Sequence, residues 1–375
     1  MILHNIQLEN YRNYPKARAE FDPGVNLLVG DNAQGKTNLL EAIAYLGSGK
    51  AFRTQKTGEL VHFGADFAQI QGKVFSQERQ QDLRWVLFSG SRPRQIYRNG
   101  VKKKTAGEIA GVLQTVLFCP EDLTVLKGGA AGRRRLADGA ICQLRPNYDG
   151  ALTEYNRILE QKNRILKDRY DTPALLEILP EYNARLCKIG ALLISYRARF
   201  FEGLAREAER YHRQFSGGKE EFSLEYHTVS TVKDPFAPVV VLEEALKDHL
   251  QSHYQAEIES CSCLTGPHKD DFEVSLNGLP IKAYGSQGQV RTATISLKLA
   301  QKALMETVSG ESPLLLLDDV LSELDPARQD FVLNQITGGQ VFITCCEPGR
   351  FTKLGKTIEI QQGSIIENGK WRMEN

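Results

Sequence analysis

Long hydrophobic runs are absent from this 375-residue sequence, and no apolar stretch approaches the ~20 residues that a membrane-spanning helix needs. The seven cysteines are odd in number and never spaced C-x-x-C, which disfavours a disulfide framework and a structural zinc site. The opening MILHNIQLENYRNY alternates apolar and polar residues like a strand and lacks the apolar core of a signal peptide. We therefore expect a cytoplasmic protein with no membrane attachment.

An excess of charge of either sign is also missing, because 47 basic residues face 46 acidic ones and the net charge is +1. No overall positive field favours a nucleic-acid partner, so any DNA binding must depend on local clusters of Lys and Arg. Three clusters are candidates, and for each a solvated charged surface is the alternative interpretation. They are Lys102, Lys103 and Lys104; Arg133, Arg134 and Arg135; and Arg157, Lys162, Arg164, Lys167 and Arg169.

Strand and helix patterns divide the sequence into an α/β part and a helical part. Short apolar strands and hairpin turns occur over residues 1–120 and again over 262–375. Between them, apolar residues recur at helical spacing over 148–211, with a bend or break near Pro180. The sequence thus predicts an α/β domain split in sequence, with residues 121–261 inserted as a mostly helical second lobe.

The motif with the clearest chemistry is a glycine-rich turn between an apolar strand, VNLLV, and a helix. It fits G-x-x-x-x-G-K-T, whose backbone N–H groups surround nucleotide phosphates at a helix N-terminus. Lys36 is expected to reach the β- and γ-phosphates, and the Thr37 hydroxyl to bind Mg²⁺. A chance match is the alternative, which the flanking strand and helix disfavour. The predicted ATP-binding residues are Gly30, Asp31, Asn32, Ala33, Gln34, Gly35, Lys36 and Thr37.

An acidic pair follows a second apolar strand near the end of the chain. Residues 314–317 are all leucine, which is typical of a parallel strand that is buried on both faces. Asp318 is expected to hold Mg²⁺ together with Thr37, and Asp319 to orient or deprotonate the attacking water. The alternative is an acidic pair that caps the next helix. With the phosphate loop in the same chain, we predict Lys36, Asp318 and Asp319 as catalytic residues.

A second glycine turn, GSQGQ, also leads into a helix, although one nucleotide needs only one phosphate cradle. If this turn faced the phosphate loop of its own chain, it would be redundant. Ser286, Gly288 and Gln289 are therefore expected to contact the γ-phosphate of the ATP that is bound to a second copy of the protein. A plain helix N-cap is the alternative. The SQGQ sequence resembles the Ser-Gly-Gly-Gln signature of ABC-type ATPases with one substitution, and SELD after the acidic pair resembles their short interface loop.

Further motifs resemble one family of these ATPases. LENYRNY, FCPEDLTVLKG, RRRLAD and TGPHKDDF are not general ATPase motifs. With the three ATP motifs, they resemble the RecF family, in the SMC-like branch of the ABC ATPases, over essentially the full length. The resemblance implies an ABC/SMC-type P-loop ATPase head in the α/β class with a mostly helical inserted lobe. It also implies weak, DNA-stimulated hydrolysis of ATP with Mg²⁺ as a switch.

The same resemblance implies partners and a process. It implies an ATP-dependent homodimer that binds single-stranded DNA and gapped duplex DNA in replication and recombinational repair. It further implies cooperation with RecR and RecO in loading RecA, in support of the SOS response. The alternative is an ABC-type subunit of another complex, in transport or chromosome maintenance. Transporter subunits usually carry Glu at the position of Asp319, which favours the repair family.

Three points remain open in the sequence. The histidine that such ATPases often carry after the final strand is missing, and Thr344 and Glu347 are the residues present there. His268 with the two aspartates of GPHKDDF suggests a metal cluster by composition, but a turn between lobes is favoured. Arg12 is expected near the phosphate loop, either in contact with nucleotide or in a structural ion pair.

Overall fold

The computed structural model describes residues 1–54, 56–336, 338–346 and 353–366. The chain divides into two compact units, and one boundary falls inside helix α7, Gln287–Ser309, between Ala300 and Gln301. Unit 1 combines residues 1–123 with the chain from Gln301 onward, and unit 2 comprises residues 124–300. The glycine turn at Ser286 therefore belongs to the helical unit, whereas the sequence pattern had assigned residues 262–375 to the ATPase lobe. No helix in the described parts is long and apolar enough to cross a membrane.

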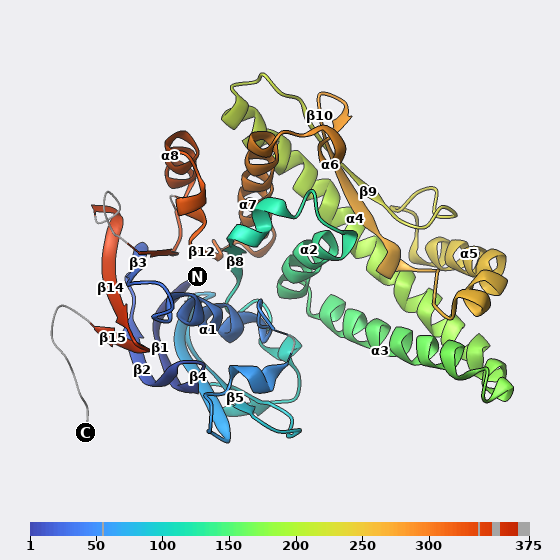
Figure 1. Cartoon of the computed structure of the whole chain (residues 1–375), viewed down its shortest axis with the longest axis horizontal. Helices are drawn as coiled ribbons and strands as arrows, with labels where there is room; N and C mark the ends of the chain where they lie inside the picture. Colours follow the sequence, from blue (N-terminus) through green and yellow to red (C-terminus); the bar gives the residue numbers. More distant parts are fainter. Residues whose placement is uncertain (55, 337, 347–352, 367–375) are drawn as a thin grey trace. The chain divides into compact units, whose positions relative to one another are not determined.

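Unit 2 is built on a pair of long helices, α3 and α4, that lie side by side as an antiparallel hairpin (Figure 1). Pro180 occupies the first turn of α4, where its missing N–H costs nothing, so it begins this helix rather than breaking it. A three-stranded sheet in the order β11-β10-β9 packs beside them. The helices are α2 Ala130–Leu144, α3 Pro146–Asp168, α4 Leu179–Ser216, α5 Val239–Ser260, α6 Ile281–Tyr284 and α7 Gln287–Ser309. The strands are β9 Phe222–His227, β10 Asp271–Leu276 and β11 Leu279–Pro280, and the 3-10 helices are Pro173–Ile178 and Pro267–Lys269.

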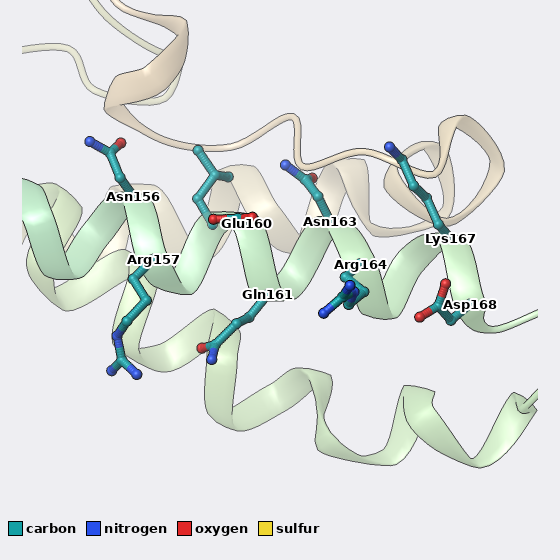
Figure 2. Close-up of a pocket in the computed structure, with 9 residues that line it drawn as sticks. Asn156, Arg157, Glu160, Gln161, Asn163, Arg164, Lys167 and Asp168 are labelled. Carbon is teal, nitrogen blue, oxygen red and sulfur yellow. The ribbon is translucent and has the colours of Figure 1, made fainter. Parts of the chain in front are cut away.

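The exposed face of α3 carries charges of both signs. Figure 2 shows Arg157, Arg164 and Lys167 alternating with Glu160 and Asp168 along an open pocket. A solvated helix face commonly has this mixed pattern. The surface of α3 is therefore far less basic than its count of Lys and Arg suggests.

Two buried ionic groups hold unit 2 together. Lys162 of α3 and Glu257 of α5 form a salt bridge of 2.5 Å, with side chains 0% and 1% exposed. Arg197 of α4 donates to the carboxylates of Asp138 and Asp270 at 3.0 and 2.7 Å and to the Pro267 carbonyl at 2.6 Å. Because buried charges are costly without partners, these contacts fix how α2, α3, α4 and α5 pack.

Unit 1 contains an antiparallel sheet in the order β2-β1-β4-β5-β6-β7. Its strands alternate buried and exposed residues, as a sheet with one solvated face requires. The last hairpin turns at Asn99 and Gly100, which both have positive φ, as the sequence Asn-Gly predicts. The strands are β1 Ile2–Tyr11, β2 Tyr14–Glu20, β4 Phe67–Ser76, β5 Arg79–Phe88, β6 Gln95–Arg98 and β7 Val101–Lys103.

The second sheet of unit 1, in the order β15-β14-β3-β13-β12-β8, is parallel except for β15. The all-leucine β12 is buried and lies between β8 and β13. The carboxyl ends of β3, β12 and β13 therefore share one edge, where ligands bind in such sheets. The strands are β3 Val25–Val29, β8 Thr115–Phe118, β12 Leu314–Leu317, β13 Val341–Cys345, β14 Gly355–Gln361 and β15 Ser364–Ile366.

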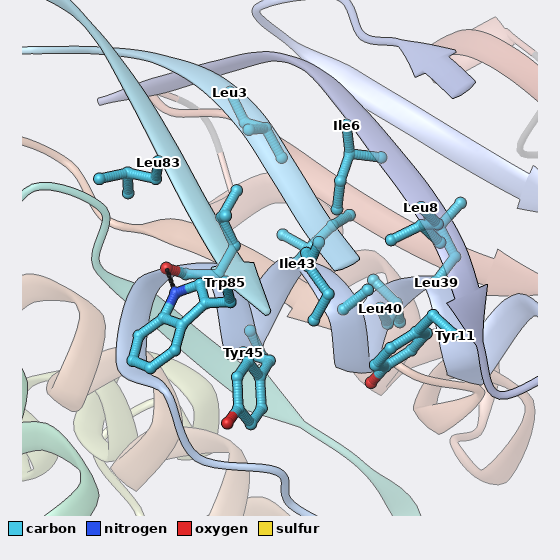
Figure 3. Close-up of a cluster of buried hydrophobic side chains, with 14 of the residues drawn as sticks. Leu3, Ile6, Leu8, Tyr11, Leu39, Leu40, Ile43, Tyr45, Leu83 and Trp85 are labelled. Atoms are coloured by element: carbon cyan, nitrogen blue, oxygen red, sulfur yellow. Dashed lines mark hydrogen bonds between the residues drawn. The ribbon is translucent and has the colours of Figure 1, made fainter. Parts of the chain in front are cut away.

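Helix α1, Lys36–Ser48, packs its apolar face on the inner face of the antiparallel sheet. Figure 3 shows Leu39, Leu40 and Ile43 of the helix facing Leu3, Ile6 and Leu8 of β1. At the far end, the Trp85 indole donates to the Leu46 carbonyl at 3.0 Å. This core fixes the helix whose first residue is Lys36. The remaining helices of unit 1 are α8 Pro326–Gln335 and the 3-10 turns Thr57–Leu60, Ala106–Glu108, Pro120–Thr124 and Val320–Glu323.

Candidate nucleotide-binding site

The loop between β3 and α1 has a backbone that glycine must supply. Gly35 has φ 122°, and a Cβ there would lie 2.7 Å from the Asn13 amide nitrogen and 2.9 Å from the Tyr14 hydroxyl. Gly30 has φ 158°, and a Cβ there would collide with the Ile360 carbonyl. The loop thus passes so close to its neighbours that a side chain is excluded at both positions. Because these two residues carry no side chain, none of theirs covers the N–H groups of the loop, which can then bind an anion.

Asn13 and Tyr14 support this loop from the side. The Asn13 amide donates to the Gln34 carbonyl at 2.9 Å, and the Tyr14 hydroxyl donates to the Gly35 carbonyl at 2.9 Å. From the β14–β15 turn, the Gly363 N–H also donates to Gln34, at 3.0 Å. The sequence reasoning did not assign Asn13 or Tyr14 a role, although both lie inside LENYRNY. These contacts explain why that motif accompanies the phosphate loop.

Lys36 lies across the loop that precedes it. Its side chain is 7% exposed, and its ammonium donates to the carbonyls of Gly30 and Asp31, the latter at 2.8 Å. The Cys346 sulfur lies 3.6 Å from the same nitrogen. The loop backbone therefore holds the one basic group of the motif against its own carbonyls, beside the turn whose N–H groups are expected to bind phosphates.

The structure brings Thr37 and Asp318 together although 281 residues separate them. Asp318 Oδ1 accepts hydrogen bonds from the Thr37 hydroxyl at 2.9 Å and from the Thr344 hydroxyl at 3.0 Å. Burial raises the pKa of Asp318, and these two hydrogen bonds limit the rise. A hydroxyl beside a carboxylate fits Mg²⁺, which is usually bound by one or two protein oxygens plus phosphate oxygens.

Asp319 adopts a strained backbone, with φ 54° in the left-handed region. Its N–H donates to the Thr344 hydroxyl at 2.7 Å, and the Ser322 hydroxyl lies 3.2 Å from its carboxylate. The side chain caps no helix: it makes no capping bond to the turn that follows, and α8 is capped by Asp325. The helix-cap alternative therefore does not account for Asp319. Of the two residues noted after the final strand, Thr344 joins this cluster and Glu347 lies outside the described residues.

Glu41 gathers two arginines next to the site. Its buried carboxylate accepts from Arg12 at 2.9 Å and from Arg53 at 3.0 Å. Burial alone would raise the pKa of Glu41, but the hydrogen bonds from both arginines outweigh burial and lower it. Arg12 thus forms the structural ion pair. Arg53, which the sequence reasoning missed, is near enough for its charge to lower the pKa of Asp318, so it adds positive charge beside the acidic pair.

In unit 2, the second glycine turn forms a capping box at the start of α7. The Ser286 hydroxyl accepts from the Gln289 N–H at 3.2 Å, and the Gln289 side-chain oxygen accepts from the Ser286 N–H at 2.9 Å. Ser286 is exposed and Gly288 half-buried. Capping uses the hydroxyl only as an acceptor, and a hydroxyl retains its own hydrogen for donation. The N-cap is therefore present and is compatible with a phosphate contact.

The candidate metal cluster of GPHKDDF is a hydrogen-bonded core of unit 2. His268 contacts the Tyr155 hydroxyl at 2.7 Å and the Cys263 carbonyl at 3.0 Å. Asp271 binds Arg133 through two hydrogen bonds of 2.6 and 2.7 Å, and the Asp270 carbonyl accepts from Arg134. Among the described residues, no group of three or more His, Cys, Asp and Glu can hold a metal ion. The segment is thus structural.

The sequence of the chain matches one known family over nearly its full length. The model of the RecF/RecN/SMC N terminal domain matches residues 2–366. The DNA replication and repair protein RecF of Clostridioides difficile is 39% identical over 375 residues, covering 98% of this chain and all of that protein. The chain belongs to the RecF family. RecF of Agathobacter rectalis is 37% identical over 97% of this chain and 99% of its own length, and RecF of Bacillus subtilis is 37% identical over 92% and 93%.

Solved structures give the same assignment. Two structures of the recombination mediator RecF, one with ATP and one with ATPrS, match with a TM-score of 0.89. Their sequence identities are 34% and 33%, and each covers 97% of this chain. The Smc head domain of Pyrococcus furiosus, at 18% identity and a TM-score of 0.54, shares the fold. The expected ABC/SMC-type ATPase head and the RecF resemblance are both confirmed.

Proposed function

We propose that this chain is an ATP-gated DNA clamp of replication and recombinational repair, which closes as a homodimer when ATP is bound. The observation that carries the proposal is the cluster of Lys36, Thr37 and Asp318, which provides a phosphate and magnesium half-site in unit 1. Two RecF structures whose names include ATP or ATPrS support ATP as the nucleotide. The Ser286 turn in unit 2 supplies the second half of the site, from the other copy.

Each residue has a separate task in this scheme. The N–H groups of residues 30–37 and the Lys36 ammonium bind the phosphates, and Thr37 with Asp318 holds Mg²⁺, which neutralises phosphate charge when bound. Asp319 orients the attacking water. Its side chain is one methylene shorter than the Glu of transport ATPases, so we expect slow hydrolysis that acts as a switch, stimulated by DNA. Hydrolysis removes the γ-phosphate that Ser286 contacts and thereby opens the dimer.

Replacing Ser286 with arginine should leave ATP binding intact and abolish ATP-dependent dimerisation. A long cationic side chain at an exposed N-cap blocks the close approach of a phosphate, and the capping bond is lost as well. We expect the dimer dissociation constant to rise by at least about tenfold, the equivalent of one lost charge-assisted hydrogen bond. Analytical ultracentrifugation with ATP measures it. Ser230→Arg, an exposed serine in another loop of unit 2, is the matched control. Normal dimerisation of Ser286→Arg would contradict the composite site.

We further propose single-stranded DNA and gapped duplex as ligands, in the cytoplasm. The RecF structures place their protein in the RecFOR pathway, which supports RecR and RecO as partners and loading of RecA as the outcome. Support of the SOS response follows from the same role. The rival assignment, a subunit of a transport or chromosome-maintenance ATPase, is supported by the fold of the Smc heads and by a family model that RecF shares with SMC proteins. The relatives at 37–39% identity are RecF proteins, which favours the repair role.

Internal contacts engage several of the basic candidates for DNA binding. Arg133 and Arg134 bind the segment at Asp270 and Asp271, and Lys162 is buried against Glu257. The rest of α3 is of mixed sign (Figure 2). Of the three expected clusters, the one at Lys102 lies in the antiparallel sheet, on strand β7. One row across the solvated face has three cations and no carboxylate, although Arg18 also pairs with Glu20 two residues along β2, at 2.9 Å. The members of the row are Arg18, Gln7, Gln71, Arg84, Tyr97 and Lys102.

Replacing Lys102 with glutamate should weaken DNA binding several-fold and lower the slope of log K against log salt by about one to two. Lys102 is exposed, and in the same row the Arg84 guanidinium lies 4.2 Å over the Tyr97 ring, an arrangement suited to phosphate and base contacts. Fluorescence anisotropy with gapped DNA at several salt concentrations measures both quantities. Lys188→Glu, at an exposed position of α4, is the charge-matched control and should change neither the DNA affinity nor the salt slope. Equal losses in both variants would indicate a nonspecific charge effect.

A further inference from the structure

The signature turn is connected to a side chain far from it in sequence. The Gln289 amide nitrogen donates to Glu220 Oε1 at 2.8 Å, and its oxygen at the same time accepts from the Ser286 N–H. Gln289 therefore joins the N-cap of α7 to the loop between α4 and β9. Without Glu220, the long Gln289 side chain keeps one partner on its own turn and loses the one that fixes its direction.

Glu220 is in turn held by a buried histidine. His212, near the end of α4, is 0% exposed, and its Nε2 lies 2.9 Å from Glu220 Oε2. Burial lowers the pKa of His212, and the Glu220 carboxylate opposes this. Because a carboxylate can only accept, the ring donates its Nε2–H to Glu220. Both carboxylate oxygens of Glu220 thus accept a hydrogen bond, one from His212 and one from Gln289.

The chain of contacts returns to the helix that it supports. His212 Nδ1 lies 3.4 Å from the Ser296 hydroxyl of α7, which has one hydrogen to donate either to this nitrogen or to the Thr292 carbonyl at 3.0 Å. Glu220 reaches this position because Gly217 and Gly218, with φ 61° and 76°, end α4 and reverse the chain. The polar segment FSGGKEE therefore brings a carboxylate back to the start of α7.

We propose that Glu220, held by His212, is a positioning residue that fixes the signature turn for the nucleotide of a second copy. This rests on the proposed function, because the turn has a task only in the ATP dimer. Glu220 acts through Gln289: it locks the side chain that orients the Ser286 N–H, and so presents the Ser286 hydroxyl in one direction before the copies meet. Preorganisation of this kind raises affinity by removing the cost of ordering at association.

The test compares Glu220→Ala with Glu220→Gln in the full-length chain. Alanine removes both contacts, so we expect ATP-dependent dimerisation to weaken about tenfold, while ATP binding by the monomer changes little. The melting temperature should fall, because the buried His212 loses its acceptor. Glutamine can still accept from Gln289 and donate to the other tautomer of His212, so dimerisation should stay within about threefold of wild type. Glu221→Ala, at an exposed neighbour, is the matched control. A merely structural role would lower the melting temperature of Glu220→Ala and leave the dimer dissociation constant of the folded chain unchanged.

A second readout does not need the dimer. Hydrogen exchange of the amides at 286–290 in the monomer should accelerate in Glu220→Ala and stay unchanged in Glu220→Gln and Glu221→Ala. If wild type dimerises with ATP and Glu220→Ala dimerises equally well with unchanged exchange, this inference fails and the proposed function stands. If wild type stays monomeric with ATP, the proposed function fails and the inference with it.

Discussion

Replacing Arg197 with methionine should destabilise unit 2 by about 3–5 kcal/mol, the cost of removing one partner from a buried ionic group. Arg197 is 3% exposed and binds Asp138, Asp270 and the Pro267 carbonyl. Methionine matches the length of the side chain but satisfies none of these groups. Burial already raises the pKa of Asp270 and Arg197 opposes that rise, so the carboxylate left behind is the main source of the loss.

Urea unfolding followed by circular dichroism at 222 nm measures this change, because most of the long helices are in unit 2. Arg185→Met provides the control on the same helix. Its ion pair with Glu154 has both side chains 45% exposed, so its loss should cost about 0–1 kcal/mol. Equal unfolding midpoints for the two variants would show that the Arg197 contacts contribute no more than a surface pair.

Replacing Lys36 with alanine should reduce affinity for Mg²⁺·ATP by at least about 100-fold. Hydrogen bonds to charged groups contribute about 1.5–3 kcal/mol each, and the ammonium is expected to make one to each of two phosphates. Lys36→Arg should also bind poorly, because a planar guanidinium replaces a compact ammonium that is 7% exposed among loop carbonyls. Isothermal titration calorimetry with a slowly hydrolysed ATP analogue measures the affinity.

The control for this variant is Lys16→Ala, which removes an exposed lysine from β2 of the same unit. It should bind nucleotide as wild type does, and both variants should unfold at similar temperatures without nucleotide. An affinity of Lys36→Ala within threefold of wild type would mean that the loop at 30–37 is not the nucleotide site.

The sequence predicts the parts of the site whose chemistry is local. The phosphate loop and the acidic pair follow from consecutive residues, because a glycine turn between strand and helix and a carboxylate after an all-leucine strand are local patterns. The meeting of Thr37 with Asp318 also follows, since the ends of parallel strands share one edge.

Supports that depend on tertiary contacts could not be predicted in this way. Tyr14 and Arg53 act on the loop and the acidic pair through neighbours distant in sequence, and Glu220 reaches Gln289 across 69 residues. Burial likewise decides which basic side chains are accessible to DNA. The sequence groups Lys162 with the other Lys and Arg residues of α3, but its side chain is 0% exposed. The periodicity of apolar residues indicates which face of a helix is buried, but not which residues of other elements it contacts.

Helix α5 and the boundary of unit 2 show the same limit. Residues 239–241 are three β-branched valines, which lower helix propensity, yet they begin helix α5. The strands at 271–280 have the pattern of α/β material, yet they pair with β9 and belong to the helical unit. Tertiary packing overrides local preference at both places.

Sedimentation of the wild-type chain with and without ATP and Mg²⁺, repeated with gapped duplex DNA, tests the ATP-gated clamp most directly. The account predicts a monomer without nucleotide, conversion to a dimer on addition of ATP, and tighter DNA binding by the dimer. A species that remains monomeric under every condition, with DNA binding that ATP does not change, would contradict it.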